Sequence, residues 1–220
     1  MKSSFILSEL EKLFPNPKCE LTYNKDYELL LKTMLSAQTT DKRVNMVTDP
    51  LFKKYDSLEK LSTLSLTEVE NYIKSIGMYK TKAKNFVSIV NSLLPLGYVP
   101  CDRTFLESLK GVGRKTTNVV LSNLYNIPCI AVDTHVHRTS IRLGLVKEND
   151  SVLETEEKLM KKFPKESYSN LHHSLVLFGR YICKSKNPSC NICPFKENCK
   201  YYKCVNQKKS NFFQLTLLLF

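Results

Sequence analysis

The chain has 220 residues, of which 42% are apolar, so it can bury one large core or two smaller ones. Its 33 Lys and Arg residues against 21 Asp and Glu give a formal charge of +12, which favours a polyanionic partner, nucleic acid ahead of a membrane surface. No stretch reaches the roughly 18–20 apolar residues that cross a bilayer, and the apolar segment 211–220 is too short. We therefore expect no membrane partner.

The spacing of apolar residues is helical along nearly the whole chain. In chain order, the predicted helices cover 27–35, 65–76, 83–94, 103–109, 114–125, 134–143, 151–163 and 169–182. Helix starts are marked by two capping boxes and two N-cap residues: Ser65 with Glu68, Ser151 with Glu154, Asp102, and Asp133. Gly77 is expected to end the second of these helices. No stretch alternates convincingly as a strand would, so the predicted class is all-α.

Four cysteines crowd into one short segment near the C-terminal end. Cys183, Cys190, Cys193 and Cys199 are separated by six, two and five residues. Because the N-terminus shows no export signal, we expect a reducing cytosol, where clustered thiols bind metal more readily than they form disulfides. The spacing fits an iron–sulfur cluster, with zinc as the alternative. Zinc sites more often use two Cys-x-x-Cys pairs, and this segment has one.

The lysines near this segment and the cysteines outside it can be explained without a functional site. Five lysines surround the cysteines: Lys184, Lys186, Lys196, Lys200 and Lys203. They form either a phosphate-contacting surface or only a solvated basic face. The isolated Cys19, Cys101 and Cys129 are expected to be small core residues.

The segment 109–115, Leu-Lys-Gly-Val-Gly-Arg-Lys, lies between two predicted helices. Gly111 and Gly113 allow positive φ and a close approach of the backbone to a ligand, and Val112 between them can plug into the core. The N–H groups of the turn and of the following helix would then face outward, as a phosphate site requires. Alone, such a turn is most often only a turn.

Lys115 falls in the first turn of the predicted helix 114–125, where the helix dipole disfavours a positive charge. We interpret it either as a phosphate clamp or as an amine kept neutral for attack on an electrophilic sugar carbon, which would form a Schiff base. Asp133, within Ala-Val-Asp-Thr-His at 131–135, reads first as a helix N-cap. An oriented carboxylate can also stabilise positive charge at a sugar ring, so the two roles are compatible.

Taken together, these residues resemble the endonuclease III family of base-excision repair glycosylases. The resemblance runs from about Tyr27 to Cys199. It rests on the segments 35–41 (LSAQTTD), 109–116 (LKGVGRKT) and 132–135 (VDTH), on the pair His172-His173, and on the cysteine spacing. It identifies residues 103–125 as a helix–hairpin–helix element.

The resemblance implies two helical lobes flanking a DNA-binding cleft. One lobe, 20–127, would be a six-helix barrel. The other, 1–19 with 128–220, would hold a [4Fe-4S] cluster in the loop 183–199. The implied protein is a bacterial, cytosolic monomer acting on double-stranded DNA that carries damaged pyrimidines or abasic sites.

The implied activity is that of a bifunctional glycosylase and abasic-site lyase. Lys115 would attack the sugar of a flipped nucleotide, Asp133 would assist, and β-elimination would break the strand 3′ to the lesion. Gln38 would fill the vacated space and Met78, where the family pattern has Leu, would be a second wedge. These implied DNA contacts are completed by the hairpin residues Gly111, Val112, Gly113 and Arg114.

Several alternatives stay open at this point. The enzyme could be a monofunctional glycosylase, in which Lys115 only contacts DNA. The chain could also be a non-catalytic DNA-binding scaffold carrying a metal such as zinc. Met78 could be an ordinary residue packing from a loop into the core. His172 and His173 are expected to pack or form hydrogen bonds rather than bind metal.

Overall fold

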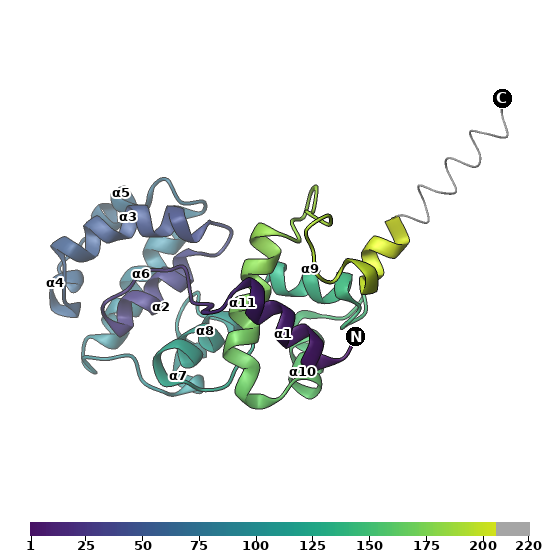
Figure 1. Ribbon diagram of the computed structural model, residues 1–220. Coiled ribbons are helices and arrows are strands. Elements are labelled where there is room, and N and C mark those ends of the chain that lie inside the picture. Colours follow the sequence, from purple (N-terminus) through teal and green to yellow (C-terminus); the bar gives the residue numbers. More distant parts are fainter. Residues whose placement is uncertain (206–220) are drawn as a thin grey trace, which may run out of the picture. The chain divides into compact units, whose positions relative to one another are not determined.

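The computed structural model describes residues 1–205, and the apolar segment 211–220 lies outside them. Within this range the secondary structure is helical, without a strand (Figure 1), which confirms the all-α class. The labelled α-helices are α1 (Ser3–Leu13), α2 (Asp26–Leu35), α3 (Asp41–Lys54), α4 (Leu58–Ser62), α5 (Leu66–Ile73), α6 (Tyr79–Leu93), α7 (Arg103–Ser108), α8 (Arg114–Tyr125), α9 (Thr134–Leu143), α10 (Val152–Lys162) and α11 (Tyr168–Tyr181). The described residues from 200 to 205 are also helical. Short 3-10 turns lie at Lys165–Ser167 and Lys196–Asn198. No described helix is long and apolar enough to cross a bilayer.

The chain divides into two compact units, one of residues Cys19–Cys129 and one that joins Met1–Lys18 to the chain from Ile130 onward. Each unit has its own cluster of buried apolar side chains. The roles of barrel and cluster domain remain predictions.

In the unit Cys19–Cys129, α2 is the central helix. It was expected to bury one stripe, but nine of its ten residues are buried, including Glu28 and Lys32. Packing against α3, α6 and α8 leaves α2 almost no solvent-exposed face. The buried polar groups have partners: the Lys32 ammonium donates to Asp49 Oδ1 at 2.6 Å and to the Thr22 carbonyl at 2.6 Å. Of the remaining helices of this unit, α4 and α5 pack on α6, and α7 packs on α8.

The expectation that Gly77 ends the helix over 65–76 was wrong. This helix, α5, ends at Ile73, and Gly77 does not adopt a positive φ. The following residue, Met78, does so instead, with φ 56°. Ile76 is 1% exposed, and its N–H donates to the Ile73 carbonyl at 2.8 Å. The left-handed backbone conformation that was expected at Gly77 therefore occurs one residue later, at Met78, and Ile76 stays buried in the core.

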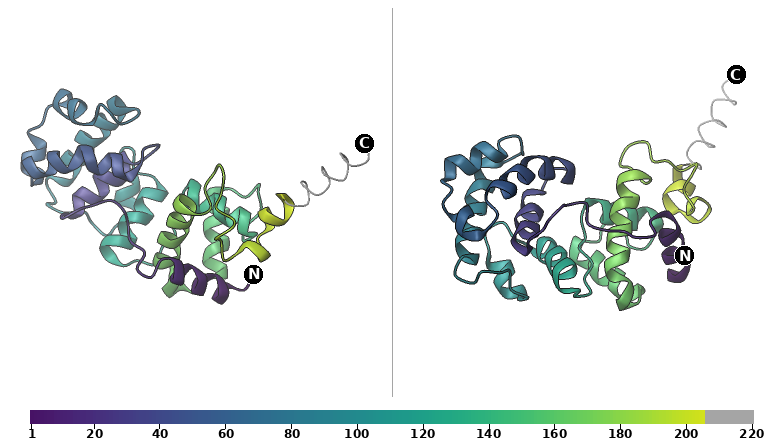
Figure 2. Two further views of the ribbon diagram at one scale, coloured as in Figure 1. Left: turned by 45° about the horizontal axis from the view of Figure 1, so that its top comes forward. Right: turned by 60° about the vertical axis from the view of Figure 1, so that its left-hand side comes forward.

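In the other unit, the N-terminal helix α1 packs on α11, close to the C-terminal end of the described chain (Figures 1 and 2). Helices α9 and α11 approach closely at Gly179, where an added Cβ would lie 2.8 Å from the Cβ of His135. His172 and His173 are buried on α11 with ring centroids 4.8 Å apart, as expected of packing residues. Burial lowers the pKa of His173 to about 4.

Candidate active site and cysteine centre

The turn between α7 and α8 has the expected form at two of its three central residues. Gly111 has φ 79°, and Val112 is buried at 4% exposure, so the turn is plugged into the core as predicted. Gly113, by contrast, has φ −107° and serves as the N-cap of α8. An added Cβ at Gly111 would collide with the side-chain amide of Asn85 on α6. The positive φ at 111 therefore favours glycine, and a larger residue there would also displace the Asn85 side chain.

Lys115 lies in the first turn of α8 and is exposed. That turn contains no acidic residue, and no side chain caps it. No described residue forms a hydrogen bond or an ion pair with the Lys115 ammonium. The helix dipole therefore faces a positive charge that nothing in the described chain offsets. Such an arrangement costs stability and favours an anionic ligand at this helix end.

Asp133 is the N-cap of α9, as predicted. Its Oδ1 accepts hydrogen bonds from the N–H groups of His135 and Val136, both at 2.8 Å. No described residue donates to Oδ2. The carboxylate is half-buried, so one oxygen orients the group while the other stays available for chemistry.

Gln38 and Met78 share a backbone conformation that neither residue type favours. Both have φ 56°, and the other non-glycine residues with positive φ in the described chain are asparagines, which tolerate it better. Both side chains are exposed, Met78 at 55%, which does not fit the reading of Met78 as a core residue. Held backbone strain of this kind tends to occur at functional sites.

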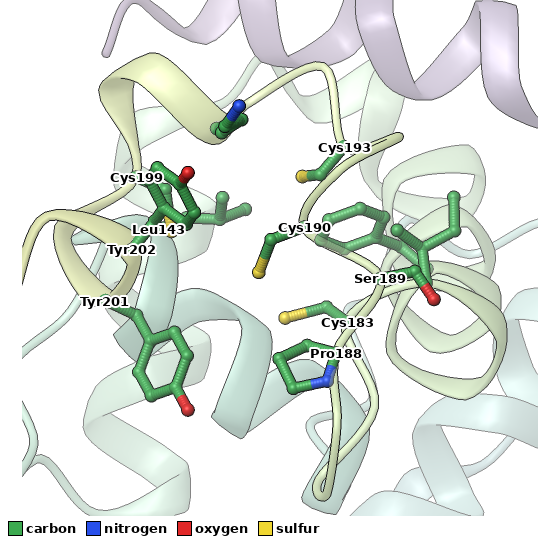
Figure 3. A pocket seen from close by; sticks show the side chains of 12 residues that line it. Leu143, Cys183, Pro188, Ser189, Cys190, Cys193, Cys199, Tyr201 and Tyr202 are labelled. Atoms are coloured by element: carbon green, nitrogen blue, oxygen red, sulfur yellow. The ribbon is translucent and has the colours of Figure 1, made fainter. Parts of the chain in front are cut away.

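The four clustered cysteines line one cavity, shown in Figure 3. It measures about 320 Å³ including its open mouth. Cys183, Cys190 and Cys193 turn their sulfurs toward this space, and its walls are largely apolar, including Leu143 and Pro188. Within residues 1–205, no three His, Cys, Asp or Glu side chains form a group that could hold a metal ion. The four thiols therefore line a shared cavity and do not converge on one point at which a single ion could be bound.

The thiols are close enough to influence each other electrostatically. Burial, and then the neighbouring Cys183 and Cys199, raise the pKa of Cys190. Burial raises the pKa of Cys193 to about 11. Four thiolates here would need compensating positive charge, which a metal centre provides. The four-thiol donor set and the shared cavity fit a multi-atom thiolate-bound cluster rather than a single metal ion.

Two residues that support the cysteine segment were not found from the sequence. Phe195 is fully buried and packs edge-on against Phe5 of α1 and Phe178 of α11. Arg142 of α9 donates to the carbonyl of Lys184 at 2.6 Å and reaches the Cys183 sulfur at 3.5 Å. The position of Phe195 between Cys193 and Cys199 could have indicated a packing role for it. No feature of the sequence around Arg142 indicated its contact with the cysteine segment.

The remaining cysteines follow the core expectation only in part. Cys129 is buried and Cys19 is half-buried against the core, but Cys101 is exposed. Cys101 lies just before the Asp102 cap, where the chain must stay at the surface to begin α7.

Comparison with known proteins identifies the family. Residues 31–165 match the family described as HhH-GPD superfamily base excision DNA repair protein. Endonuclease III of Bacillus subtilis (strain 168) is 47% identical over 198 residues, which cover 89% of this chain and 90% of that protein. The chain belongs to the endonuclease III family. Another member, endonuclease III of Escherichia coli (strain K12), is 40% identical over 203 residues, covering 91% of this chain and 96% of that one.

Solved structures of endonuclease III agree with this fold. A non-covalent endonuclease III–DNA complex matches with a TM-score of 0.89 at 46% identity, covering 93% of this chain and 96% of that one. A trapped endonuclease III–DNA covalent intermediate matches with a TM-score of 0.87, also at 46% identity, covering 92% and 98%. The resemblance noted from the sequence is therefore confirmed.

Proposed function

We propose that this endonuclease III family member removes oxidised pyrimidines from double-stranded DNA and then cleaves the strand, with Lys115 as the nucleophile. The observation that carries the proposal is the exposed Lys115 ammonium in the first turn of α8, without an offsetting partner in the described chain. Support also comes from a relative that has been captured as a covalent intermediate with DNA.

The reaction follows from the chemistry of an amine and a sugar. The neutral Lys115 amine attacks C1′ of the flipped nucleotide, the bond from C1′ to the base breaks, and the base leaves. Asp133 accepts a proton and stabilises the positive charge that develops at the sugar. The nitrogen lone pair then forms a C1′=N bond as the C1′–O4′ bond breaks, and O4′ takes up a proton, so the opened sugar is held as an imine. The imine acidifies the C2′ protons. Loss of one of them expels the 3′ phosphate, so the strand breaks 3′ to the lesion.

Gln38 and Met78 are the residues we assign to the space left by the flipped base. Exposed side chains on strained loops can enter a base stack, and an apolar wedge such as Met lowers the cost of unstacking. The hairpin residues Gly111, Gly113 and Arg114 would bind the phosphate backbone through N–H groups at the start of α8. The N–H of buried Val112 donates to the Leu109 carbonyl at 3.1 Å, so Val112 would serve this contact by holding the turn in shape.

We assign a [4Fe-4S] cluster to Cys183, Cys190, Cys193 and Cys199. When bound, such a cluster joins four thiolates and so fixes the fold of the segment between them. The lysines beside it can then contact phosphates from a rigid loop. Bacterial cytosol, where clusters are assembled and chromosomal DNA lies, is the compartment that suits both features.

A duplex with one oxidised thymine separates the three candidate activities. We expect the wild-type enzyme to cut the damaged strand 3′ to the lesion without alkali, and to leave an undamaged duplex intact. A monofunctional glycosylase would release the base but leave the strand whole until alkali is added. A non-catalytic scaffold would bind without releasing any base. Binding should weaken steeply with salt, because phosphate contacts release counterions.

The cluster assignment predicts a coloured protein. We expect the anaerobically purified enzyme to show broad visible absorption that Cys193→Ser abolishes, because one thiolate ligand is lost. Cys204→Ser is the matched control, since Cys204 is exposed and lies outside the four-cysteine pattern. A colourless protein with one zinc per chain by elemental analysis would refute the assignment.

A further inference from the structure

Lys82, on α6, is a buried cation with an unusual set of partners. It is 4% exposed, and no described carboxylate lies within ion-pair distance of it. Its ammonium donates to the carbonyl of Leu35 at 2.9 Å, to the carbonyl of Ala37 at 2.6 Å and to Thr39 Oγ1 at 3.3 Å. Burial lowers the pKa of Lys82, so enclosing this charge is costly.

All three acceptors belong to the end of α2 and the loop between α2 and α3, and Gln38 stands among them. An ammonium has three donors, and here all three are spent on this one stretch of chain. The Ala37 carbonyl belongs to the peptide that joins Ala37 to Gln38. Lys82 therefore holds the backbone immediately before the strained residue.

The same lysine is also bonded to the second strained loop. Its backbone N–H donates to the carbonyl of Met78 at 3.1 Å. Met78 is the N-cap of α6, and Lys82 follows it by one helical turn. This main-chain bond is the first-turn helix bond that any residue at position 82 would form, so it fixes where Lys82 stands relative to Met78. From that position the Lys82 side chain reaches the loop of Gln38.

The helix that carries Lys82 also contacts the hairpin. Asn85 is three residues further along α6 and packs against Gly111. Met78, Lys82 and Asn85 are spaced at i, i+4 and i+7, which places them along one side of the helix. That side connects both strained loops with the turn that we assign to the DNA backbone.

We propose that Lys82 is a positioning residue that holds Gln38 and Met78 in register, so that the two side chains enter the duplex together when the target nucleotide leaves the stack. This inference rests on the wedge roles proposed above. A salt bridge on the surface could not serve in this way, because it would rearrange when DNA arrives. A buried ammonium with three backbone and hydroxyl acceptors keeps the loop fixed before DNA binds.

The test compares two buried lysines of the same unit. Lys32 is 2% exposed and is bonded to Thr22 and Asp49, outside the two strained loops. Lys82→Met and Lys32→Met each remove one buried ammonium and keep a similar side-chain volume. Thermal unfolding of both variants reports the loss of stability that any buried lysine would cause.

A second measurement reports the unstacking of the base opposite the lesion, which a general loss of protein stability would not change. A duplex carries a tetrahydrofuran abasic-site analogue with 2-aminopurine opposite it, and fluorescence is measured at saturating enzyme. We expect the wild type and Lys32→Met to give the same fluorescence increase, and Lys82→Met to give less than half of it. Single-turnover base release should fall about tenfold or more in Lys82→Met, because misplaced groups near the reacting centre cost rate steeply.

Two further variants separate failure of this inference from failure of the wedge roles. Gln38→Ala and Met78→Ala should each lower the fluorescence increase. If they do and Lys82→Met does not, Lys82 is only structural. If neither lowers it, the wedge assignments are wrong, and the role of Lys82 falls with them. An equal loss in Lys32→Met and Lys82→Met would also overturn the inference. Should Lys82→Met fail to fold, Lys82→Gln, which keeps an amide donor, takes its place under the same criteria.

Discussion

Replacing Lys115 with glutamine is expected to abolish the covalent adduct that borohydride traps between the enzyme and an abasic duplex. Only an imine can be reduced to a stable amine, and a glutamine side chain cannot form one. Strand cleavage by β-elimination should be lost with the adduct. Binding to the same duplex should weaken by no more than about tenfold, since a single phosphate-proximal charge is removed. Gel electrophoresis of the reduced complex measures the adduct, and fluorescence anisotropy measures binding.

Lys110→Gln is the matched control for this prediction. Lys110 is also exposed and lies in the same hairpin, but before the glycines rather than in the first turn of α8. The Lys110→Gln variant should bind DNA with a salt dependence similar to that of Lys115→Gln, and it should form the trapped adduct at the wild-type level. An undiminished adduct in Lys115→Gln would show that another amine is the nucleophile.

Replacing Asp133 with asparagine is expected to slow base release by about a hundredfold or more, the usual range for loss of a general acid–base group. The substitution keeps the cap, because asparagine is as good an N-cap as aspartate and its side-chain oxygen can still accept from His135 and Val136. Melting temperature should therefore change little while the rate falls. Single-turnover excision of an oxidised thymine measures the rate.

The chain offers a control of the same geometry in Asp102. It caps α7 by accepting from the N–H groups of Thr104 and Phe105 at 2.8 and 3.2 Å, much as Asp133 caps α9. Asp102→Asn should leave base release unchanged. If Asp133→Asn were equally harmless, Asp133 would be a helix cap and nothing more.

The helix starts were predictable from the sequence because caps are local. The capping boxes at Ser65 and Ser151 and the caps at Asp102 and Asp133 all form as expected. Each depends on residues within three positions of one another, so no knowledge of tertiary packing is required. The helix over 134–143 has the predicted bounds for the same reason. The helix over 114–125 also has the predicted bounds, although no side chain caps its start at Gly113.

The helices α1, α3 and α4 were not predicted. In α3, Pro50 lies inside the helix and breaks the apparent pattern, although Thr40 caps its start and Val44, Thr48 and Leu51 are buried at helical spacing. Pro50 has no N–H to donate to the carbonyl four residues earlier, and the burial of neighbouring residues of α3 on the core offsets this loss.

Contacts between distant parts of the sequence could not be predicted from the sequence alone. Lys82 and its acceptors are separated by 43 to 47 residues, and a lysine on an otherwise amphipathic helix looks like an exposed one. Arg142 is about 41 positions from the cysteine whose sulfur it approaches. By contrast, the four cysteines could be recognised because they lie within one short loop, where spacing alone brings them together.

The central claim is that the Lys115 nitrogen becomes covalently joined to deoxyribose. Peptide mass spectrometry of the borohydride-reduced complex tests it most directly, after digestion of the protein and of the DNA. We expect the added mass of the reduced sugar fragment on the peptide that contains Lys115, located at that side chain by fragmentation. The same mass on any other residue, or no modified peptide from an active enzyme, would contradict the proposed chemistry.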